Sequence, residues 1–417
     1  VLLLNRMPVA FAMLASGAAG IYWLNGWQPL VGILTGGPYE HVASFTLSAV
    51  PMFVLLGEFL SAGKFTKDLF DSTNKWLGHF RGGLAYAAVC GGALLAAISG
   101  STAAAAATLA RAAYPSMKRF GYADSFSTGV LAVVGTLAIM IPPSLAFVLY
   151  GVFTETSVAK MLMAGVVPGL LTAIGYGVTI FFTVKRNPEL IPPAQAPVAL
   201  EDRVSSLVGI GPILLLMLFM LVGIYSGAVT PTEVGAVAAL AALFIGLFAR
   251  RIRRAEFLSA LSGASRSSAM VLTIIAGSAV FSVFLTLTGV TQDLIAYVQA
   301  AEFPRYVVLI AILTLLIILG FFLDQLAILV LVLPLAFPLI TSLDFDPIWF
   351  GVLFVKTAEI GFITPPMGLN AYVVSGVTGV PTRLIFRGIW PFVLIELVLL
   401  SLLIIFPGVV TWLPYNM

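Results

Sequence analysis

Apolar stretches of about 20 residues recur along the whole chain, and they restrict its fold more than any other feature. Examples are Met161–Val184, Leu207–Gly227 and Ile389–Phe406. A lipid bilayer offers no water to backbone polar groups, so stretches of this length satisfy those groups internally, as helices. The chain has 60% hydrophobic and 9% charged residues, where soluble domains have about a quarter charged. We therefore predict an all-α polytopic membrane protein with no sizeable soluble domain.

The remaining composition excludes several classes of function. The single cysteine, Cys90, lies in an apolar stretch, so disulfides and thiolate metal sites are not expected. The net charge of +3 is small, and its basic residues lie beside apolar segments, which favours cytoplasmic loops over nucleic-acid binding. The sequence begins at Val1 with too few residues before Pro8 for a spanning helix, so the first helix is expected to be incomplete. No signal peptide is predicted.

Prolines reveal an internal repeat. An offset of 223 aligns five prolines: Pro8 with Pro231, Pro115 with Pro338, Pro142-Pro143 with Pro365-Pro366, and Pro168 with Pro391. Random placement of the 24 prolines predicts about 0.6 such matches. The predicted units are a first repeat over residues 1–184, a cytoplasmic linker over 185–206 and a second repeat over 207–417.

Charge gives an independent test of how the two repeats are oriented, because loops rich in Lys and Arg stay in the cytoplasm. Residues 64–81 and 111–119 contain seven Lys and Arg, whereas the matched windows 287–304 and 334–342 contain none. Conversely, residues 25–45 contain none, and the matched 248–268 contains Arg250, Arg251, Arg253, Arg254 and Arg266. The repeats are therefore predicted to be inverted. The Arg250–Arg254 cluster is read mainly as a topology determinant, with lipid head-group contact as an alternative.

This orientation makes both flanks of Gly82–Ala110 cytoplasmic, so the segment must enter the membrane and return. Each arm would have about 14 residues, or about 21 Å of helix, which is shorter than a hydrocarbon core of about 30 Å. A re-entrant helical hairpin is therefore predicted over about 82–110. Its counterpart is predicted over about 305–333 and enters from the other side.

Each hairpin is followed by a helix that meets a double proline, in Ile141-Pro142-Pro143-Ser144 and in Thr364-Pro365-Pro366. Proline removes a backbone donor, so both helices are predicted to break inside the membrane, at 141–144 and 364–366. One such break is often only a packing kink. Two at equivalent positions, each beside a hairpin tip, favour a binding site.

Polar residues at the two tips and near the second break each have a structural and a functional interpretation. Ser99, Ser101 and Thr102 could allow close helix packing, as the following alanines suggest, or could bind a ligand through hydroxyl and carbonyl groups. For Asp324 we favour cation contact or capping of the tip. Lys356 and Glu359 are predicted to form an internal ion pair. Glu58 is expected to reach the cytoplasmic interface.

Several motifs, in order along the chain, then resemble one known family. They are Gly-Ser-Thr at 100–102, Ile-Pro-Pro-Ser at 141–144, Thr-Pro-Thr-Glu at 230–233, Gly-Phe-Phe-Leu-Asp at 320–324, Asp-Pro-Ile-Trp-Phe-Gly at 346–351 and Glu-Ile-Gly-Phe-Ile-Thr-Pro-Pro at 359–366. Over essentially its whole length the chain resembles the large membrane subunit, called M or DctM-like, of tripartite ATP-independent periplasmic (TRAP) transporters.

The resemblance implies an ion-transporter superfamily fold in the bacterial inner membrane and secondary active transport by an elevator motion. Sodium would be the coupling ion, without an organic cofactor. The partners would be a small four-helix membrane subunit and a periplasmic binding protein that delivers substrate. The substrates would be small carboxylates such as C4-dicarboxylates, sialic acids and other sugar acids. Scaffold helices are expected around Pro8–Leu24 and Phe45–Leu60 and at their matches.

The resemblance also implies site residues, of which many would act through backbone carbonyls. The residues expected to bind sodium are Ser99, Gly100, Ser101, Ile141, Pro142, Gly320, Asp324, Gly361, Thr364 and Pro366. The residues expected to bind substrate are Ser101, Thr102, Ser144, Thr364 and Asn370.

Two alternative functions stay open. One is a carrier of the same superfamily that acts alone, such as a sodium- or proton-coupled dicarboxylate carrier. The other is a membrane protein that does not transport, either a scaffold or an intramembrane enzyme. The enzyme interpretation is weak, because Ala97 stands where the Gly-x-Ser-Gly of intramembrane serine proteases needs a glycine.

Overall fold

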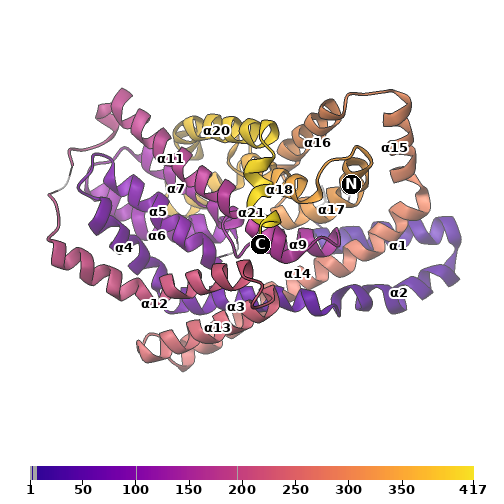
Figure 1. Ribbon diagram of the computed structural model, residues 1–417, viewed down its shortest axis with the longest axis horizontal. Coiled ribbons are helices and arrows are strands. Elements are labelled where there is room, and N and C mark those ends of the chain that lie inside the picture. The colour runs from indigo at the N-terminus through magenta and orange to yellow at the C-terminus, as the bar shows by residue number, and fades with distance from the viewer. Residues whose placement is uncertain (1, 3–6, 100, 195) are drawn as a thin grey trace.

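Helices form all the regular structure in the described part of the chain. A computed structural model describes residues 2, 7–99, 101–194 and 196–417, and the side chains of 96–99 lie outside this description. Seven helices within it are long and apolar enough to cross a membrane, or eight if one bent pair counts as a single span. The predicted all-α membrane fold is therefore confirmed (Figure 1).

The first half of the chain contains scaffold helices, a hairpin, a broken helix and closing helices. Its elements are α1 (Val9–Asn25), α2 (Trp27–Val42), η1 (Phe45–Ser48), α3 (Ala49–Ala62), α4 (Phe65–Leu77), α5 (Gly83–Ser99), α6 (Thr102–Arg119), α7 (Asp124–Val134), α8 (Leu137–Met140), α9 (Leu145–Phe153), α10 (Val158–Ala164) and α11 (Val166–Arg186).

The second half repeats this order after a connecting segment that contains η2 (Pro188–Leu190). Its elements are α12 (Leu200–Tyr225), α13 (Pro231–Phe248), α14 (Arg254–Thr288), α15 (Val290–Ala300), α16 (Arg305–Gly320), α17 (Gln325–Ser342), α18 (Pro347–Ile363), α19 (Leu369–Thr378), α20 (Thr382–Ile405) and α21 (Gly408–Tyr415). The offset of 223 places Thr102, which begins α6, on Gln325, which begins α17. It also places Asp124, which begins α7, on Pro347, which begins α18. Between the two halves, α11 continues to Arg186 and α12 begins at Leu200.

Both hairpins have their tips where predicted, but their arms are longer. The arms α5 and α6 have 17 and 18 residues, and α16 and α17 have 16 and 18. The prediction ended the first hairpin at about Ala110, whereas α6 continues to Arg119. Lys118 and Arg119 lie in its last turn, where cations interact favourably with the helix dipole. At 1.5 Å per residue even the longest arm measures about 27 Å.

Both broken helices are present. In the first, α7–α8 and α9 are bent by 41° at the break. In the second, α18 ends at Ile363 and α19 begins at Leu369. The Pro142-Pro143 and Pro365-Pro366 peptide bonds are both cis.

Glycines bring helices from different parts of the chain into backbone contact, as is common in membrane proteins. A Cβ on Gly277 in α14 would lie 2.3 Å from the Ala10 carbonyl oxygen of α1. A Cβ on Gly129 in α7 would lie 2.5 Å from the Gly388 carbonyl carbon of α20. The first contact builds the scaffold, and the second joins the broken helix of one half to the closing helix of the other.

The helices separate into two groups in Figure 1. The scaffold helices α3, α12, α13 and α14 lie along the lower side, with α1 and α2 extending to the right. The hairpin α5–α6 lies at the left and α16–α17 at the right, with α18 and α20 between them. The contacts of α13 with α3, and of α14 with both α3 and α1, hold the lower group together.

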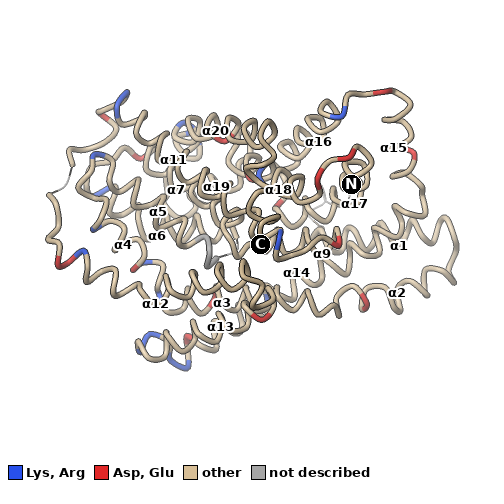
Figure 2. Tube along the Cα trace, viewed as in Figure 1, with Lys and Arg blue, Asp and Glu red and all other residues tan. Residues whose placement is uncertain are grey.

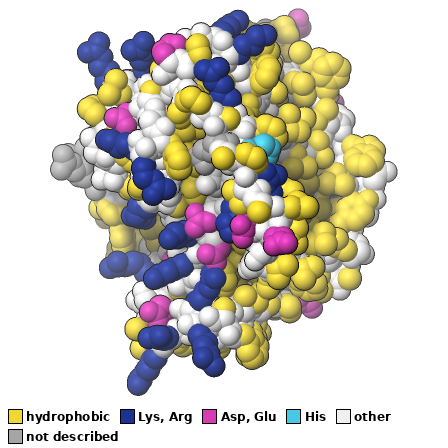
Figure 3. Space-filling model, turned by 90° about the vertical axis from the view of Figure 1, so that its left-hand side faces the viewer, with side chains coloured by type: hydrophobic (Ala, Val, Ile, Leu, Met, Phe, Trp, Pro, Cys, Tyr) yellow, Lys and Arg dark blue, Asp and Glu magenta, His cyan; other side chains and the backbone are white. Residues whose placement is uncertain are grey.

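Basic loops from the two halves lie on the same side of the molecule. The Arg251 guanidinium pairs with the Asp68 carboxylate and donates to the Gly63 carbonyl oxygen at 3.5 Å. Blue segments accordingly gather in the left part of Figure 2, and Figure 3 shows many Lys and Arg side chains over that face. Inverted repeats require this arrangement, because their cytoplasmic loops occupy different positions in the two sequences.

Candidate transport site

A cavity of about 380 Å³ lies where both hairpin tips, both helix breaks and the scaffold helices α3 and α14 meet. This volume is within the range of small-molecule sites. The polar residues that line it are Glu58, Ser61, Thr66, Ser101, Thr102, Thr108, Ser267, Asp324 and Gln325, and the breaks contribute Pro143 and Leu369.

The first tip presents the start of α6 to the cavity. Ser101 is the extended N-cap of this helix, and its Oγ accepts a hydrogen bond from the Ala104 N–H at 3.5 Å. Thr102 follows as the first helical residue and is buried. The N–H groups of a first helical turn have no partners within the helix, so this end of α6 favours negative charge.

The second tip repeats the geometry with an acidic cap. The Asp324 Oδ1 accepts a hydrogen bond from the Ala327 N–H at 2.9 Å, so Asp324 caps α17. Capping of the tip is one of the two roles predicted for this residue. Gly320, at the end of α16, lies directly against Gly361 of α18. A Cβ on Gly361 would be only 2.6 Å from the Gly320 Cα atom. This contact holds the second tip against the second broken helix.

At the first break the polar groups serve mainly the fold. The Ile141 N–H donates to the Leu137 carbonyl at 3.0 Å and ends α8. Pro142 is buried. The Ser144 Oγ accepts from the Phe147 N–H at 3.4 Å and caps α9. Ser144 is fully buried and does not line the cavity.

At the second break the predicted residues point in different directions. The Thr364 hydroxyl donates to the Ile360 carbonyl at 2.5 Å. The Asn370 Nδ2 donates to the Ala132 carbonyl at 3.0 Å, which ties α19 to α7. Pro366 faces a separate open groove together with Arg383 and Arg387.

The structure therefore brings together only part of the predicted site. Ser101, Thr102 and Asp324 share the cavity, whereas Ser144, Thr364, Asn370 and Pro366 do not line it. Gly100 and the side chain of Ser99 lie outside the described residues.

Two residues of the cavity were not selected as site residues from the sequence. Glu58 lines the cavity because α3 packs along α14 with Glu58 against Gly263, and its expected position at the cytoplasmic interface stays a prediction. Gln325 was not selected from the sequence, although the offset of 223 pairs it with Thr102.

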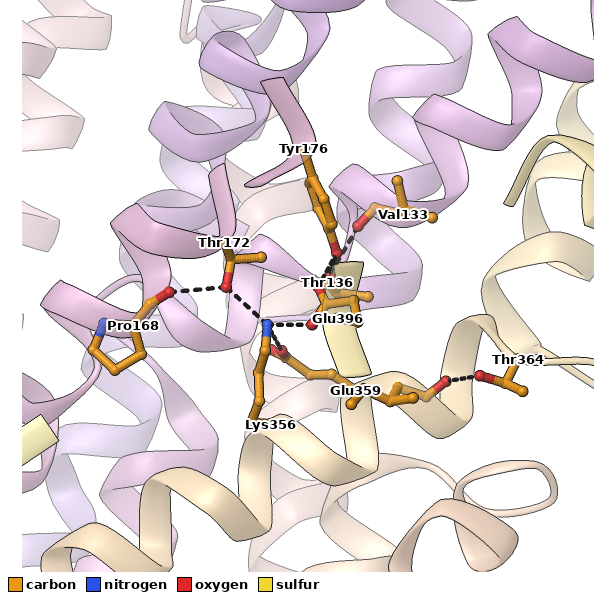
Figure 4. A network of polar contacts seen from close by, with 10 residues as sticks. Val133, Thr136, Pro168, Thr172, Tyr176, Lys356, Glu359, Thr364 and Glu396 are labelled. Atoms are coloured by element: carbon orange, nitrogen blue, oxygen red, sulfur yellow. Dashed lines mark hydrogen bonds and ion pairs between the residues drawn. The ribbon is translucent and has the colours of Figure 1, made fainter. Parts of the chain in front are cut away.

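A second polar cluster lies deep among α11, α18 and α20 (Figure 4). The Lys356 ammonium lies 2.5 Å from the Glu396 Oε2 and 3.7 Å from the Glu359 Oε2, and it donates to the Thr172 hydroxyl at 2.8 Å. The Tyr176 hydroxyl donates to the other oxygen of Glu396. The predicted pair of Lys356 and Glu359 is confirmed, but the nearer partner is Glu396.

The electrostatics of the cavity set a condition on its ligand. Its described lining contains the carboxylates of Glu58 and Asp324 and no Lys or Arg. Hydroxyl groups and the starts of α6 and α17 face it. An anion could be held by these N–H and O–H donors, but the carboxylates oppose it unless a cation is bound as well. Oxygen donors of this kind suit a hard cation. No group of three or more His, Cys, Asp or Glu side chains that could hold a metal ion occurs among the described residues.

Paired hairpins, paired broken helices and a cavity between them and a scaffold define the chain as a multi-pass membrane transport protein. The family profile described as "Tripartite ATP-independent periplasmic transporter, DctM component" matches residues 1–409. The chain therefore belongs to the DctM family of TRAP transporter large permease proteins. It is a multi-pass inner-membrane protein and one component of a tripartite system.

Individual relatives agree with this assignment. The chain is 40% identical to the C4-dicarboxylate TRAP transporter large permease protein DctM of Pseudomonas aeruginosa, over 90% of this chain and 88% of that protein. It is 33% identical to the 2,3-diketo-L-gulonate TRAP transporter large permease protein YiaN of Escherichia coli, over 96% and 92%. The crystal structure of the Alcanivorax borkumensis YdaH transporter has the same fold, with a TM-score of 0.72 and 14% identity over 96% of this chain and 97% of that one.

Proposed function

We propose that this chain is the transport subunit of a sodium-coupled importer of small organic acids that works by an elevator motion. Its partners are a small four-helix membrane subunit and a periplasmic binding protein that delivers the substrate. The substrate is a carboxylate, such as a C4-dicarboxylate or a sugar acid. The chain acts as a carrier and catalyses no chemical reaction.

The observation that carries this proposal is the cavity shared by both hairpin tips, both breaks and the scaffold. One wall belongs to the hairpins and broken helices, and the other belongs to α3 and α14. A site on such a boundary can change sides when one group of helices slides along the other. In this mechanism the hairpins and broken helices move as a unit and carry the substrate past α3 and α14.

The described lining of the cavity has two carboxylates and no basic side chain. In this proposal, bound sodium supplies the positive charge. In the proposed sites, one ion lies between the first tip and Ile141–Pro142, and another between the second tip and the segment from Gly361 to Thr364. Carbonyl oxygens freed at the breaks and the side chains of Ser101 and Asp324 are suitable hard donors. Bound sodium offsets the carboxylates and orders the tips, which then present N–H and O–H groups to the substrate carboxylate.

The similarity to relatives named for a C4-dicarboxylate and for 2,3-diketo-L-gulonate supports the substrate class, because both compounds are small organic acids. The tripartite description of the family supports the two partners.

The test is uptake into proteoliposomes that contain this chain and its small membrane subunit, with and without the binding protein and an inward sodium gradient. A panel of radiolabelled organic acids identifies the substrate. We expect accumulation of a carboxylate only when both sodium and the binding protein are present. Accumulation without the binding protein would instead indicate a stand-alone carrier, and no accumulation of any acid would contradict transport.

A further inference from the structure

Gln325 is an unusual member of the cavity wall because its polar group has no partner. The side chain is 6% exposed, and neither its Nε2 nor its Oε1 makes a hydrogen bond to any residue that the structure describes. Burying an amide without a partner is unfavourable, because the group loses its hydrogen bonds to water. The simplest explanation is that this amide forms hydrogen bonds to a ligand during transport.

Local structure does not use this amide. Gln325 begins α17, but the capping bond of that helix comes from Asp324, whose Oδ1 accepts from the Ala327 N–H. The Gln325 side chain instead belongs to the cavity wall, together with Asp324 and Leu326 of the same tip.

The internal repeat shows why this position matters. The residue equivalent to Gln325 is Thr102, which begins α6, is also buried and also lines the cavity. The two tips thus contribute the same position from opposite repeats. One tip carries a short hydroxyl and the other a longer amide, so the two sides of the cavity offer different chemistry. A ligand whose two ends differ can bind here in one orientation.

The amide offers two kinds of contact. Its Nε2 group carries two donors that suit an anion, whereas its Oε1 atom is an acceptor that suits a cation. The dependence of uptake on sodium is therefore measured separately below. The described lining contains no Lys or Arg, so Gln325 supplies its only side-chain N–H donors, beside the hydroxyl groups and the helix starts. We propose that Gln325 is a substrate-selecting residue that donates to a carboxylate, keto or hydroxyl oxygen of the transported acid. This inference rests on the proposed function and adds to it the side chain that selects among acids.

The experiment compares wild type, Gln325→Leu, Gln325→Asn and Gln299→Leu in the sodium-driven uptake assay, with the acid that wild type accumulates best. Gln299 is an exposed glutamine of α15 and does not line the cavity, so it controls for the exchange itself. We expect Gln325→Leu to raise KM for the acid about tenfold or more, because a site built for a hydrogen bond loses it. Gln325→Asn should fall between Gln325→Leu and wild type, and Gln299→Leu should match wild type.

Two further readouts separate selection of substrate from a general loss of structure. The sodium concentration for half-maximal uptake should stay within twofold of wild type in Gln325→Leu. The preference between two acids that differ by one hydroxyl or keto group should also fall. A KM within twofold of wild type, or equal losses for sodium and substrate, would overturn the inference while the proposed function stands. An inactive wild type would overturn both. If Gln325→Leu does not fold, Gln325→Asn alone decides, by the same changes in KM and preference.

Discussion

At the scale of single residues, the buried Lys356 ammonium offsets the charge of the carboxylates packed around it. It lies between the carboxylates of Glu396 and Glu359, and all three side chains are at most 1% exposed. Removing one member of a buried ion pair typically costs roughly 3–5 kcal/mol, because the remaining charge is left unpaired. We therefore expect Lys356→Met to lower the thermal unfolding temperature of the purified protein strongly.

The double variant Lys356→Met/Glu396→Gln is the matched control for this prediction. It removes one positive and one negative charge together, so the formal charge of the cluster returns to that of wild type. Its unfolding temperature should recover a large part of the loss. If the double variant is no more stable than Lys356→Met, lost packing rather than unpaired charge explains the effect.

The side chains at the two tips give a second prediction at this scale. Ser101→Ala and Asp324→Ala each remove a helix cap and a proposed sodium ligand, so both should raise the sodium concentration needed for half-maximal uptake. Ser157→Ala and Asp346→Ala remove comparable caps, of α10 and α18, outside the cavity. These two controls should leave sodium activation unchanged. Unchanged activation in both tip variants would remove these side chains from the mechanism.

At the scale of elements, the contact between α16 and α18 fixes the second tip against the second break. A Cβ on Gly361 would lie 2.6 Å from the Gly320 Cα atom and 2.7 Å from the Ile317 carbonyl oxygen. Gly361→Ala should therefore force the two helices apart, at a cost of roughly 1–3 kcal/mol. Both the unfolding temperature and sodium activation should fall. Gly376→Ala in α19 meets no atom within 4 Å, and it should leave both quantities unchanged or raise stability slightly.

The contact between the last helix, α21, and the start of α18 should weaken at high pH. The Tyr415 hydroxyl donates to the Asp346 Oδ2 at 2.6 Å, and this bond to a carboxylate raises the pKa of Tyr415 to about 12. Folding thus favours the neutral phenol over its ordinary pKa of about 10. The stabilisation is fully present below about pH 10 and is lost as pH rises through about 12.

The measurement is tyrosinate absorption during an alkaline titration of wild type and Tyr415→Phe. The difference between the two curves should titrate near pH 12. A difference that titrates near pH 10 would show that the contact with Asp346 does not hold the phenol in solution.

At the scale of the whole molecule, transport by an elevator motion requires that the hairpins slide past the scaffold. Ser61 of α3 and Thr108 of α6 line the cavity from these two groups of helices. In a Cys90→Ala background, a reversible thiol cross-linker between Ser61→Cys and Thr108→Cys should abolish uptake, and reduction should restore it. The same reagent on each single-cysteine variant is the control. Full uptake by the cross-linked protein would contradict the sliding motion.

The sequence predicted the features that depend on local chemistry. Double prolines mark both breaks, and small or acidic caps mark both tips, because these residues act on the backbone beside them. The prediction shortened the hairpin arms because it ended the first hairpin at Ala110 and assigned Arg111 to a loop, although a helix can continue with charged residues beyond its apolar part. The domain boundaries and the opposite orientation of the repeats stay predictions.

Contacts between distant residues could not be predicted in this way. The Tyr176 hydroxyl and the Glu396 carboxylate are 220 residues apart in sequence, and no local pattern links them. The position of Glu58 depends on how α3 packs against α14. Gln325 is different, because the repeat itself pairs it with Thr102 and could have identified it.

The polar cluster of α11, α18 and α20 also has a consequence for how the protein is made. Thr172 and Tyr176 enter the membrane with the first half of the chain, whereas Lys356 and Glu396 leave the ribosome much later. Until α20 is inserted, the first half holds hydroxyl groups without their ionic partners, and the Lys356 charge cannot be neutralised by Glu396. Completion of this cluster is thus a late step in the assembly of the fold, because it joins α11 to helices that are synthesised last.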